Sequence, residues 1–317
     1  MRKIDVHQHI WTAPLLEALE RRRELPFVRR QGDLTVLFLA GERPYVIETA
    51  TETAASRARL LAADGVERAL VCLSSPLGIE SLAREQATEL ICAYHDGALA
   101  LGEPFGVWGA IPLEHPHPAD VDHAIDRGCV GIALPAGALA NVNTLASLYL
   151  VLARLEMIGA PLLVHPGPGV GWHAAEPSGG SLNDPLWWPA LTRYVAQMQG
   201  AWLAFRAGGR PEHPRLRVIF SMLAGLAPLQ LERLHARGGP PGDARDPRIF
   251  YDTSSYGPAA IGAVAAVVGE SQLVYGSDRP VADPPELAEG SGLDLGVLDE
   301  AAERALRASP DELAAVV

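Results

Sequence analysis

Residues 4–9 read Ile4-Asp5-Val6-His7-Gln8-His9, a short apolar segment that ends in two histidines. Its first residues, Ile4–Val6, predict a β-strand close to the start of the chain. Side chains at positions i and i+2 of a strand face the same side, so we expect His7 and His9 to point together at its C-terminal end. Two imidazoles in this arrangement can bind one metal ion.

Beyond this segment, short apolar runs alternate with longer stretches of helical period. Seven further strands are predicted, at Ala69–Leu73, Phe105–Ile111, Val130–Leu134, Leu162–His165, Arg217–Ser221, Ile249–Asp252 and Leu273–Gly276. Helices are expected between them, at Ala54–Ala63, Ile79–Tyr94, Leu145–Ile158, Trp187–Phe205, Ala227–Arg237 and Ala259–Val268. Eight strands in this alternation predict an α/β fold, the (β/α)8 TIM barrel. A doubly wound sheet is the rival, but no G-x-G-x-x-G follows the first strand.

Two longer connections interrupt the alternation. Residues 27–47 contain two β-like runs around a Gly-Glu-Arg-Pro turn, which predicts a small β-hairpin inserted after the first strand. Pro166–Pro185 is rich in Gly and Pro and follows the fifth strand, so it is expected to border the active site. Neither connection resembles a domain linker, and residues 1–317 are expected to form one domain.

Composition limits the classes of partner. The chain is 48% hydrophobic and 20% charged, with 26 Lys and Arg against 38 Asp and Glu, which gives a net charge of −12. Such a chain supplies a globular core, and its acidity disfavours nucleic acid. The three cysteines are too scattered for a disulfide framework or a cysteine zinc site. The absence of a long apolar run and of room for a signal peptide predicts a cytoplasmic protein with no membrane contact. The expected partner is a small-molecule substrate, and a homodimer is a further expectation.

Two more residues extend the histidine pair to a candidate metal site. His165 ends the fifth predicted strand, in Leu162-Leu163-Val164-His165-Pro166-Gly167, and Asp278 follows the eighth. Strand ends on one face of a barrel converge near its axis, so these four side chains could meet there. Three imidazoles and one carboxylate suit Zn²⁺ first, with Mn²⁺ or Fe²⁺ as alternatives.

These motifs resemble the amidohydrolase superfamily, in the family 2 branch that includes aminocarboxymuconate semialdehyde decarboxylase. The resemblance rests on the His-x-His, the His-Pro-Gly after the fifth strand and Gly276-Ser277-Asp278-Arg279-Pro280 after the eighth, and it covers essentially the whole chain. It implies a metal-bearing barrel with His7, His9, His165 and Asp278 as ligands. No Lys ends the fourth strand, so one divalent ion is expected.

One position departs from the family pattern. Relatives carry a His after the sixth strand, in a segment like I-x-x-H-x-G-G, whereas this chain has Met222 in Val218-Ile219-Phe220-Ser221-Met222. A thioether cannot serve as a proton donor and is a poor base. Catalysis would then depend on Asp278, or on His173 in the Gly/Pro-rich connection. A third interpretation is a barrel that has lost catalysis.

Other candidates lie at the predicted barrel mouth. Trp11, Trp172 and Met222 could contact a planar substrate, although core packing is the commoner fate of Trp. Arg279 could bind a substrate carboxylate or, equally, hold a neighbouring loop. Asp252 could orient a ligand histidine, or cap the helix that follows it.

The sequence favours a metal-dependent hydrolase that acts on a small carboxylate-bearing amide, lactone or ester through metal-activated water. The alternative is a non-oxidative decarboxylase, a lyase of an aromatic or unsaturated acid. A catalytically impaired barrel is the third hypothesis, because Met222 replaces the expected His.

Overall fold

The computed structural model describes residues 3–171, 185, 187–239, 242–282 and 295–307. Two predicted site residues, Trp172 and His173, lie outside these ranges. No helix within the described ranges is both long and apolar enough to span a bilayer.

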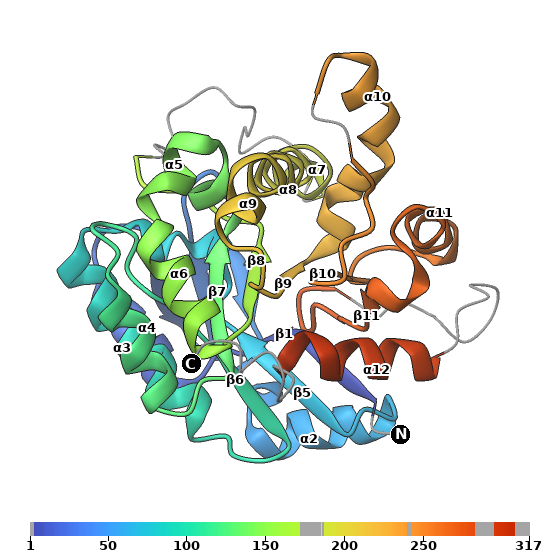
Figure 1. The fold of residues 1–317 in the computed structure, drawn as a ribbon. Helices are drawn as coiled ribbons and strands as arrows, with labels where there is room; N and C mark the ends of the chain where they lie inside the picture. Colours follow the sequence, from blue (N-terminus) through green and yellow to red (C-terminus); the bar gives the residue numbers. More distant parts are fainter. Residues whose placement is uncertain (1–2, 172–184, 186, 240–241, 283–294, 308–317) are drawn as a thin grey trace.

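Eight parallel strands form one sheet whose order follows the chain (Figure 1). They are β1 (Ile4–His9), β5 (Arg68–Cys72), β6 (Phe105–Gly109), β7 (Gly131–Pro135), β8 (Leu162–His165), β9 (Val218–Phe220), β10 (Ile249–Asp252) and β11 (Leu273–Val274). Backbone bonds from Val6 N to Tyr275 O (2.9 Å) and from His9 N to Arg279 O (2.7 Å) join the first strand to the last. The predicted (β/α)8 barrel is confirmed.

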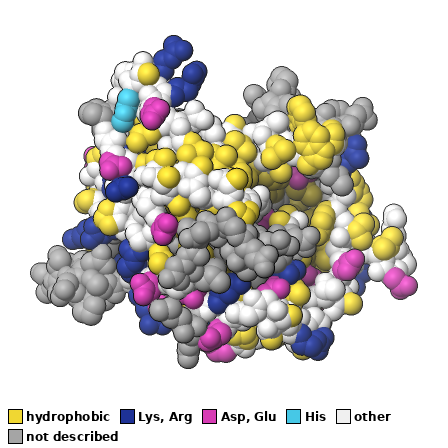
Figure 2. Space-filling view, turned by 90° about the vertical axis from the view of Figure 1, so that its right-hand side faces the viewer, with side chains coloured by type: hydrophobic (Ala, Val, Ile, Leu, Met, Phe, Trp, Pro, Cys, Tyr) yellow, Lys and Arg dark blue, Asp and Glu magenta, His cyan; other side chains and the backbone are white. Residues whose placement is uncertain are grey.

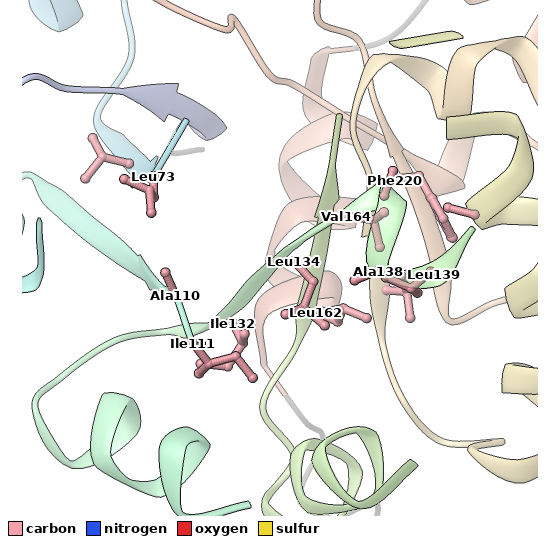
Figure 3. Packing of buried hydrophobic residues seen from close by; sticks show 14 of the residues in the cluster. Leu73, Ala110, Ile111, Ile132, Leu134, Ala138, Leu139, Leu162, Val164 and Phe220 are labelled. Atoms are coloured by element: carbon pink, nitrogen blue, oxygen red, sulfur yellow. The ribbon is translucent and has the colours of Figure 1, made fainter. Parts of the chain in front are cut away.

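Successive side chains of each strand point alternately into and out of the barrel, so the hydrophobic residues form one layer inside it and one outside it. Leu70, Leu163 and Phe250 belong to a cluster inside the barrel, which Ala301 and Ala302 of the last helix also join. The neighbouring strand residues belong to a larger cluster that the surrounding helices cover. Figure 3 shows part of this larger cluster, where residues from adjacent strands pack together.

Helices connect and surround the strands. They are α1 (Ala13–Arg21), α2 (Ala54–Ala63), α3 (Arg84–Leu99), α4 (Pro118–Asp126), α5 (Val142–Ser147), α6 (Tyr149–Ile158), α7 (Trp188–Leu191), α8 (Arg193–Ala204), α9 (Arg210–Glu212), α10 (Leu231–Ala236), α11 (Pro258–Val268) and α12 (Leu295–Leu306). Three predicted helices are divided: Leu148 separates α5 from α6, Thr192 separates α7 from α8, and extended backbone at Leu82 separates a 3-10 turn at Ile79–Ser81 from α3. Helical period alone does not reveal such short breaks.

The insertion after β1 is larger than the predicted hairpin. It forms a three-stranded antiparallel sheet of β2 (Phe27–Gln31), β3 (Leu34–Phe38) and β4 (Tyr45–Ile47). The predicted hairpin is the pair of β3 and β4, in which Tyr45-Val46-Ile47 lies opposite Leu37, Val36 and Thr35. The strand that was not predicted is β2, which pairs with β3 along its whole length, from Phe27 opposite Phe38 to Gln31 opposite Leu34.

A β-bulge in β1 aims the two histidines. Asp5 pairs with Ala69 and Gln8 with Val71, so β1 has one more residue than β5 over this interval. Val6 faces the barrel interior, and without the extra residue His7 and His9 would face outward. The simple i, i+2 argument therefore gives the correct shared side, and the bulge makes that side the interior.

Hydrophobic side chains also reach the surface. Figure 2 shows a broad group of them across one face of the molecule. Large exposed hydrophobic residues include Leu150, Leu191 and Leu229. A homodimer that buries such residues stays a prediction.

Candidate metal centre and cavity

Three histidines and one aspartate converge at the C-terminal ends of the barrel strands. His7 and His9 come from β1, His165 ends β8 and Asp278 follows β11. One potential ligand atom from each of the four lies within 4.8 Å of the others. His7 Nε2 is 3.3 Å from His9 Nε2, which is 3.0 Å from Asp278 Oδ1. The four residues that the sequence selects are thus brought together.

The second nitrogen of each imidazole is held by an acceptor. His7 Nδ1 bonds Asp252 Oδ2 at 2.8 Å, His9 Nδ1 bonds the Cys72 carbonyl at 3.1 Å and His165 Nδ1 bonds the Pro166 carbonyl at 2.8 Å. Carboxylate and carbonyl oxygens require a proton on Nδ1, so a neutral ring carries its lone pair on Nε2. All three histidines therefore present Nε2 to the cluster.

The donor set fits a divalent cation. Asp278 Oδ1 is buried, and no described residue is a hydrogen-bond partner for it. Burial alone would raise the pKa of Asp278, but the adjacent imidazoles lower it to about 2, so the group is a carboxylate. Burial lowers the pKa of His165 well below its usual value, which leaves that ring neutral. Burial also opposes a positive charge on His7, but the pairing with Asp252 raises the pKa of this ring. The pairing therefore favours a proton on His7, and a bound cation would take the place of that proton.

Asp278 is held in place by the backbone. Its φ of 60° lies in the left-handed region, and its N–H donates to His7 O at 2.9 Å. Asp5 Oδ1 accepts from the backbone N–H groups of both His7 (3.0 Å) and Ser277 (3.1 Å). One buried carboxylate therefore links the β1 ligands to the segment that carries Asp278.

Met222 begins an unusual turn after β9. Five consecutive residues, Met222–Leu226, have φ between 48° and 62°, although only one of them is glycine. Asp252 Oδ1 accepts from Met222 N at 3.0 Å, while its other oxygen holds His7. Asp252 thus makes the predicted contact with a ligand histidine, and it also holds the first residue of the turn.

A cavity of about 470 Å³ opens above the cluster. His9, His165 and Asp278 contribute to its wall, and so do Trp11 and Met222, as predicted for substrate contact. The other lining residues come from the insertion, from the segments after β5, β8 and β11, and from the region of α7 and α8: Leu37, Leu39, Gly41, Glu42, Arg43, Pro44, Tyr45, Ser74, Pro76, Leu77, Pro166, Pro185, Trp187, Pro189, Ala190, Tyr194 and Val281. Its size suits a small organic molecule.

Arg279 is not among the residues that line this cavity, and its side chain bonds a neighbouring segment. Its Nε and Nη2 bond the two carboxylate oxygens of Asp64 at 2.9 and 3.2 Å. Asp64 follows α2, so the guanidinium holds a neighbouring segment, which is the alternative considered above. The insertion residues Glu42 and Tyr45 were missed as cavity residues. The only sequence signal for them is the position of the insertion after a strand that carries ligands.

Comparisons with known proteins support the fold. No protein-family model matches the sequence, and no curated protein is similar enough to count as a relative. Among solved structures, 5-carboxyvanillate decarboxylase from Sphingomonas paucimobilis has 18% identity and a TM-score of 0.70 over 97% of this chain and 99% of its own. An amidohydrolase II structure has 18% identity and a TM-score of 0.66 over 99% of both chains.

A third similar structure contains a metal. It is 5-carboxyvanillate decarboxylase from Novosphingobium aromaticivorans, complexed with manganese and 4-hydroxy-3-methoxy-5-nitrobenzoic acid. It has 14% identity and a TM-score of 0.64 over 98% of this chain and 92% of its own. These likenesses show that the chain has the fold of amidohydrolase-type barrels. The resemblance drawn from the sequence motifs is confirmed at the level of the fold.

Proposed function

We propose that this protein is a metal-dependent, non-oxidative decarboxylase of an aromatic acid. One observation carries the proposal: a cluster of three imidazoles and a carboxylate forms part of the wall of a cavity that Trp11, Trp187 and Met222 also line. Decarboxylases of aromatic acids among the similar solved structures support it.

His7, His9, His165 and Asp278 would hold one divalent ion. The donor set suits Zn²⁺, and the manganese of a similar structure makes Mn²⁺ equally worth testing. When bound, the ion would supply positive charge against the negative charge that develops on the substrate as CO₂ leaves.

The residues of the chain would supply the remaining requirements. The bond between ring carbon and carboxyl carbon breaks, its electron pair stays on the ring carbon, and one proton takes the place of CO₂. Asp278 is the carboxylate of the cluster and could carry this proton from a substrate hydroxyl or from water to the carbon. The aromatic walls would hold a planar ring and exclude water.

Met222 favours this reaction over the hydrolysis first expected from the sequence. Hydrolysis requires a group that deprotonates or orients the attacking water. The thioether stands where relatives of the resembled family place a histidine, and it cannot perform that role. Decarboxylation consumes no water and needs only one proton at the ring carbon, which Asp278 could carry in place of the missing His.

The test combines manganese-loaded protein with a panel of hydroxylated aromatic acids that includes 5-carboxyvanillate and 2,6-dihydroxybenzoate. We expect release of CO₂ and, in D₂O, one deuterium at the vacated ring carbon. Asp278→Asn should abolish both, whereas Glu48→Gln, an exposed position outside the cavity, should retain them.

Aromatic amides, esters and lactones form the opposing arm of the test. Incorporation of ¹⁸O from labelled water into their products, without CO₂ from any acid, would identify a hydrolase instead. Activity that survives both metal removal and Asp278→Asn would contradict a metal-dependent reaction of either kind.

A further inference from the structure

The loop between β3 and β4 places a carboxylate in the cavity wall. Glu42 lies in this loop, and Arg193 and Tyr194 at the start of α8 both donate to its Oε1. The Arg193 guanidinium also approaches the Gly41 carbonyl, at 3.5 Å. These contacts fasten the insertion to α8 and fix where the Glu42 carboxylate lies.

The second oxygen of Glu42 is left for a ligand. Both donors use Oε1, and within the described residues Oε2 has no hydrogen-bond partner. The side chain is 22% exposed and lines the same cavity as His9 and Asp278. A carboxylate oxygen that is fixed, accessible and unpaired is a strong acceptor.

The surroundings make this acceptor selective. Leu37, Leu39, Pro44 and Trp187 contribute apolar surface to the cavity. In an apolar cavity, a few fixed polar groups determine which ligands bind. A ligand that removes water from these groups without forming hydrogen bonds to them binds more weakly, because their desolvation is not compensated. Glu42 would favour a hydrogen-bond donor and oppose a second carboxylate.

We propose that Glu42 recognises a hydroxyl or amino group on the ring system of the aromatic acid, while Arg193 and Tyr194 position it. This inference rests on the proposed function, since it assumes that the acid's carboxylate binds at the metal cluster. It deepens that function by naming the substrate class: aromatic acids with a hydrogen-bond donor remote from the carboxylate.

The test measures dissociation constants by calorimetry with manganese-loaded protein and matched probes. The probes are benzoate and 4-hydroxybenzoate, and biphenyl-4-carboxylate and 4′-hydroxybiphenyl-4-carboxylate, so that two lengths sample the cavity. In at least one pair the hydroxyl should tighten binding by about tenfold, the worth of a hydrogen bond to a charged group. Biphenyl-4,4′-dicarboxylate should bind more weakly than the monocarboxylate.

Variants assign the effect to the carboxylate. Glu42→Gln should reduce the hydroxyl advantage to about threefold or less, because a neutral acceptor forms a weaker bond. The matched control, Glu48→Gln, removes the same charge from an exposed position near the insertion and should keep the full advantage. The comparison of hydroxylated with unsubstituted acids uses the parent protein alone, so it remains valid even if Glu42→Gln disturbs the loop.

The outcomes separate the two proposals. Equal binding of both members of each pair, or tighter binding of the dicarboxylate, would overturn the role of Glu42 and leave the proposed function standing. If no aromatic acid binds to the metal-loaded protein, both proposals fail together.

Discussion

At the scale of single residues, Asp5 controls the direction of the β1 histidines. The bulge in β1 leaves the His7 N–H without a strand partner, and Asp5 Oδ1 accepts from it at 3.0 Å. The same oxygen accepts from Ser277 N, and Gln8 Nε2 donates to the other oxygen at 2.7 Å. A buried carboxylate with three donors thus stabilises the bulge and the approach to Asp278.

We therefore expect Asp5→Ala to weaken metal binding. Loss of the carboxylate leaves two buried N–H groups unpaired, and the ligands lose their support; removal of comparable supporting groups lowers metal affinity about 10- to 100-fold. Titration of the folded variant with Mn²⁺ or Zn²⁺ measures this directly. The control is Asp33→Ala, an exposed acid in the insertion, which should bind metal as the parent does. Unchanged affinity in Asp5→Ala would refute the positioning role.

His95 makes stability depend on pH. This α3 side chain is buried, and its Nε2 accepts from Ala110 N at 3.0 Å. Burial, together with the nearby Arg127, lowers its pKa to about 4 from the ordinary 6.5. Between these values the unfolded chain binds a proton that the folded protein does not, so stability falls as the pH falls through this interval.

Urea denaturation between about pH 7 and about pH 4.5 tests this expectation. His95→Gln keeps an acceptor for Ala110 but cannot titrate. The free energy of unfolding of the parent should therefore fall relative to that of the variant as the pH drops, by about 2 kcal/mol over this interval. Parallel curves for the two proteins would show that His95 contributes nothing to the pH dependence.

At the scale of elements, the left-handed turn after β9 is held by its surroundings. Left-handed φ costs non-glycine residues roughly 1–2 kcal/mol each. Asp252 bonds the start of the turn, and Gln199 Nε2 donates to Gly225 O at 2.8 Å. A Cβ at Gly225 would lie 2.8 Å from Val195 O, so α8 also requires the absence of a side chain there.

Two glycine substitutions measure the cost of this turn. Ala224 has φ 55°, whereas Ala227, equally buried, is outside the left-handed stretch. Both substitutions remove one buried methyl group, but only Ala224→Gly relieves an unfavourable φ. We expect Ala227→Gly to destabilise the protein by about 1–2 kcal/mol more than Ala224→Gly in chemical denaturation. Equal losses would mean that the turn carries no such cost.

The elements differ in how far the sequence predicts them. Leu162–His165 and Ile249–Asp252 match their strands residue for residue, because continuous apolar runs mark buried parallel strands. β1 extends to His9, beyond the predicted Val6, since its last residues are polar yet buried. The bulge and the left-handed turn depend on contacts with Asp5, Asp252 and α8, and no local pattern predicts them.

At the scale of the whole molecule, the candidate ligands could be predicted because the barrel topology determines where strand ends meet. Any chain of eight alternating units brings the ends of its first, fifth and last strands to one face. The cavity walls could not be predicted in the same way. Arg279 pairs with Asp64, which lies 215 positions earlier, and Glu42 pairs with residues about 150 positions later. Such pairings follow from packing between distant segments.

The same topology couples metal binding to the stability of the entire barrel. The ligands come from β1, from β8 and from the segment after β11, so an ion would join the first strand to the last where the barrel closes. An ion that binds only the folded state stabilises it by about 2.7 kcal/mol at a concentration 100 times its dissociation constant. We expect Mn²⁺ to raise the melting temperature of chelator-treated protein, and His7→Ala/His9→Ala to abolish the rise while Glu48→Gln retains it. An equal rise in the double variant would place the ion elsewhere and contradict the assignment of this cluster as the metal centre.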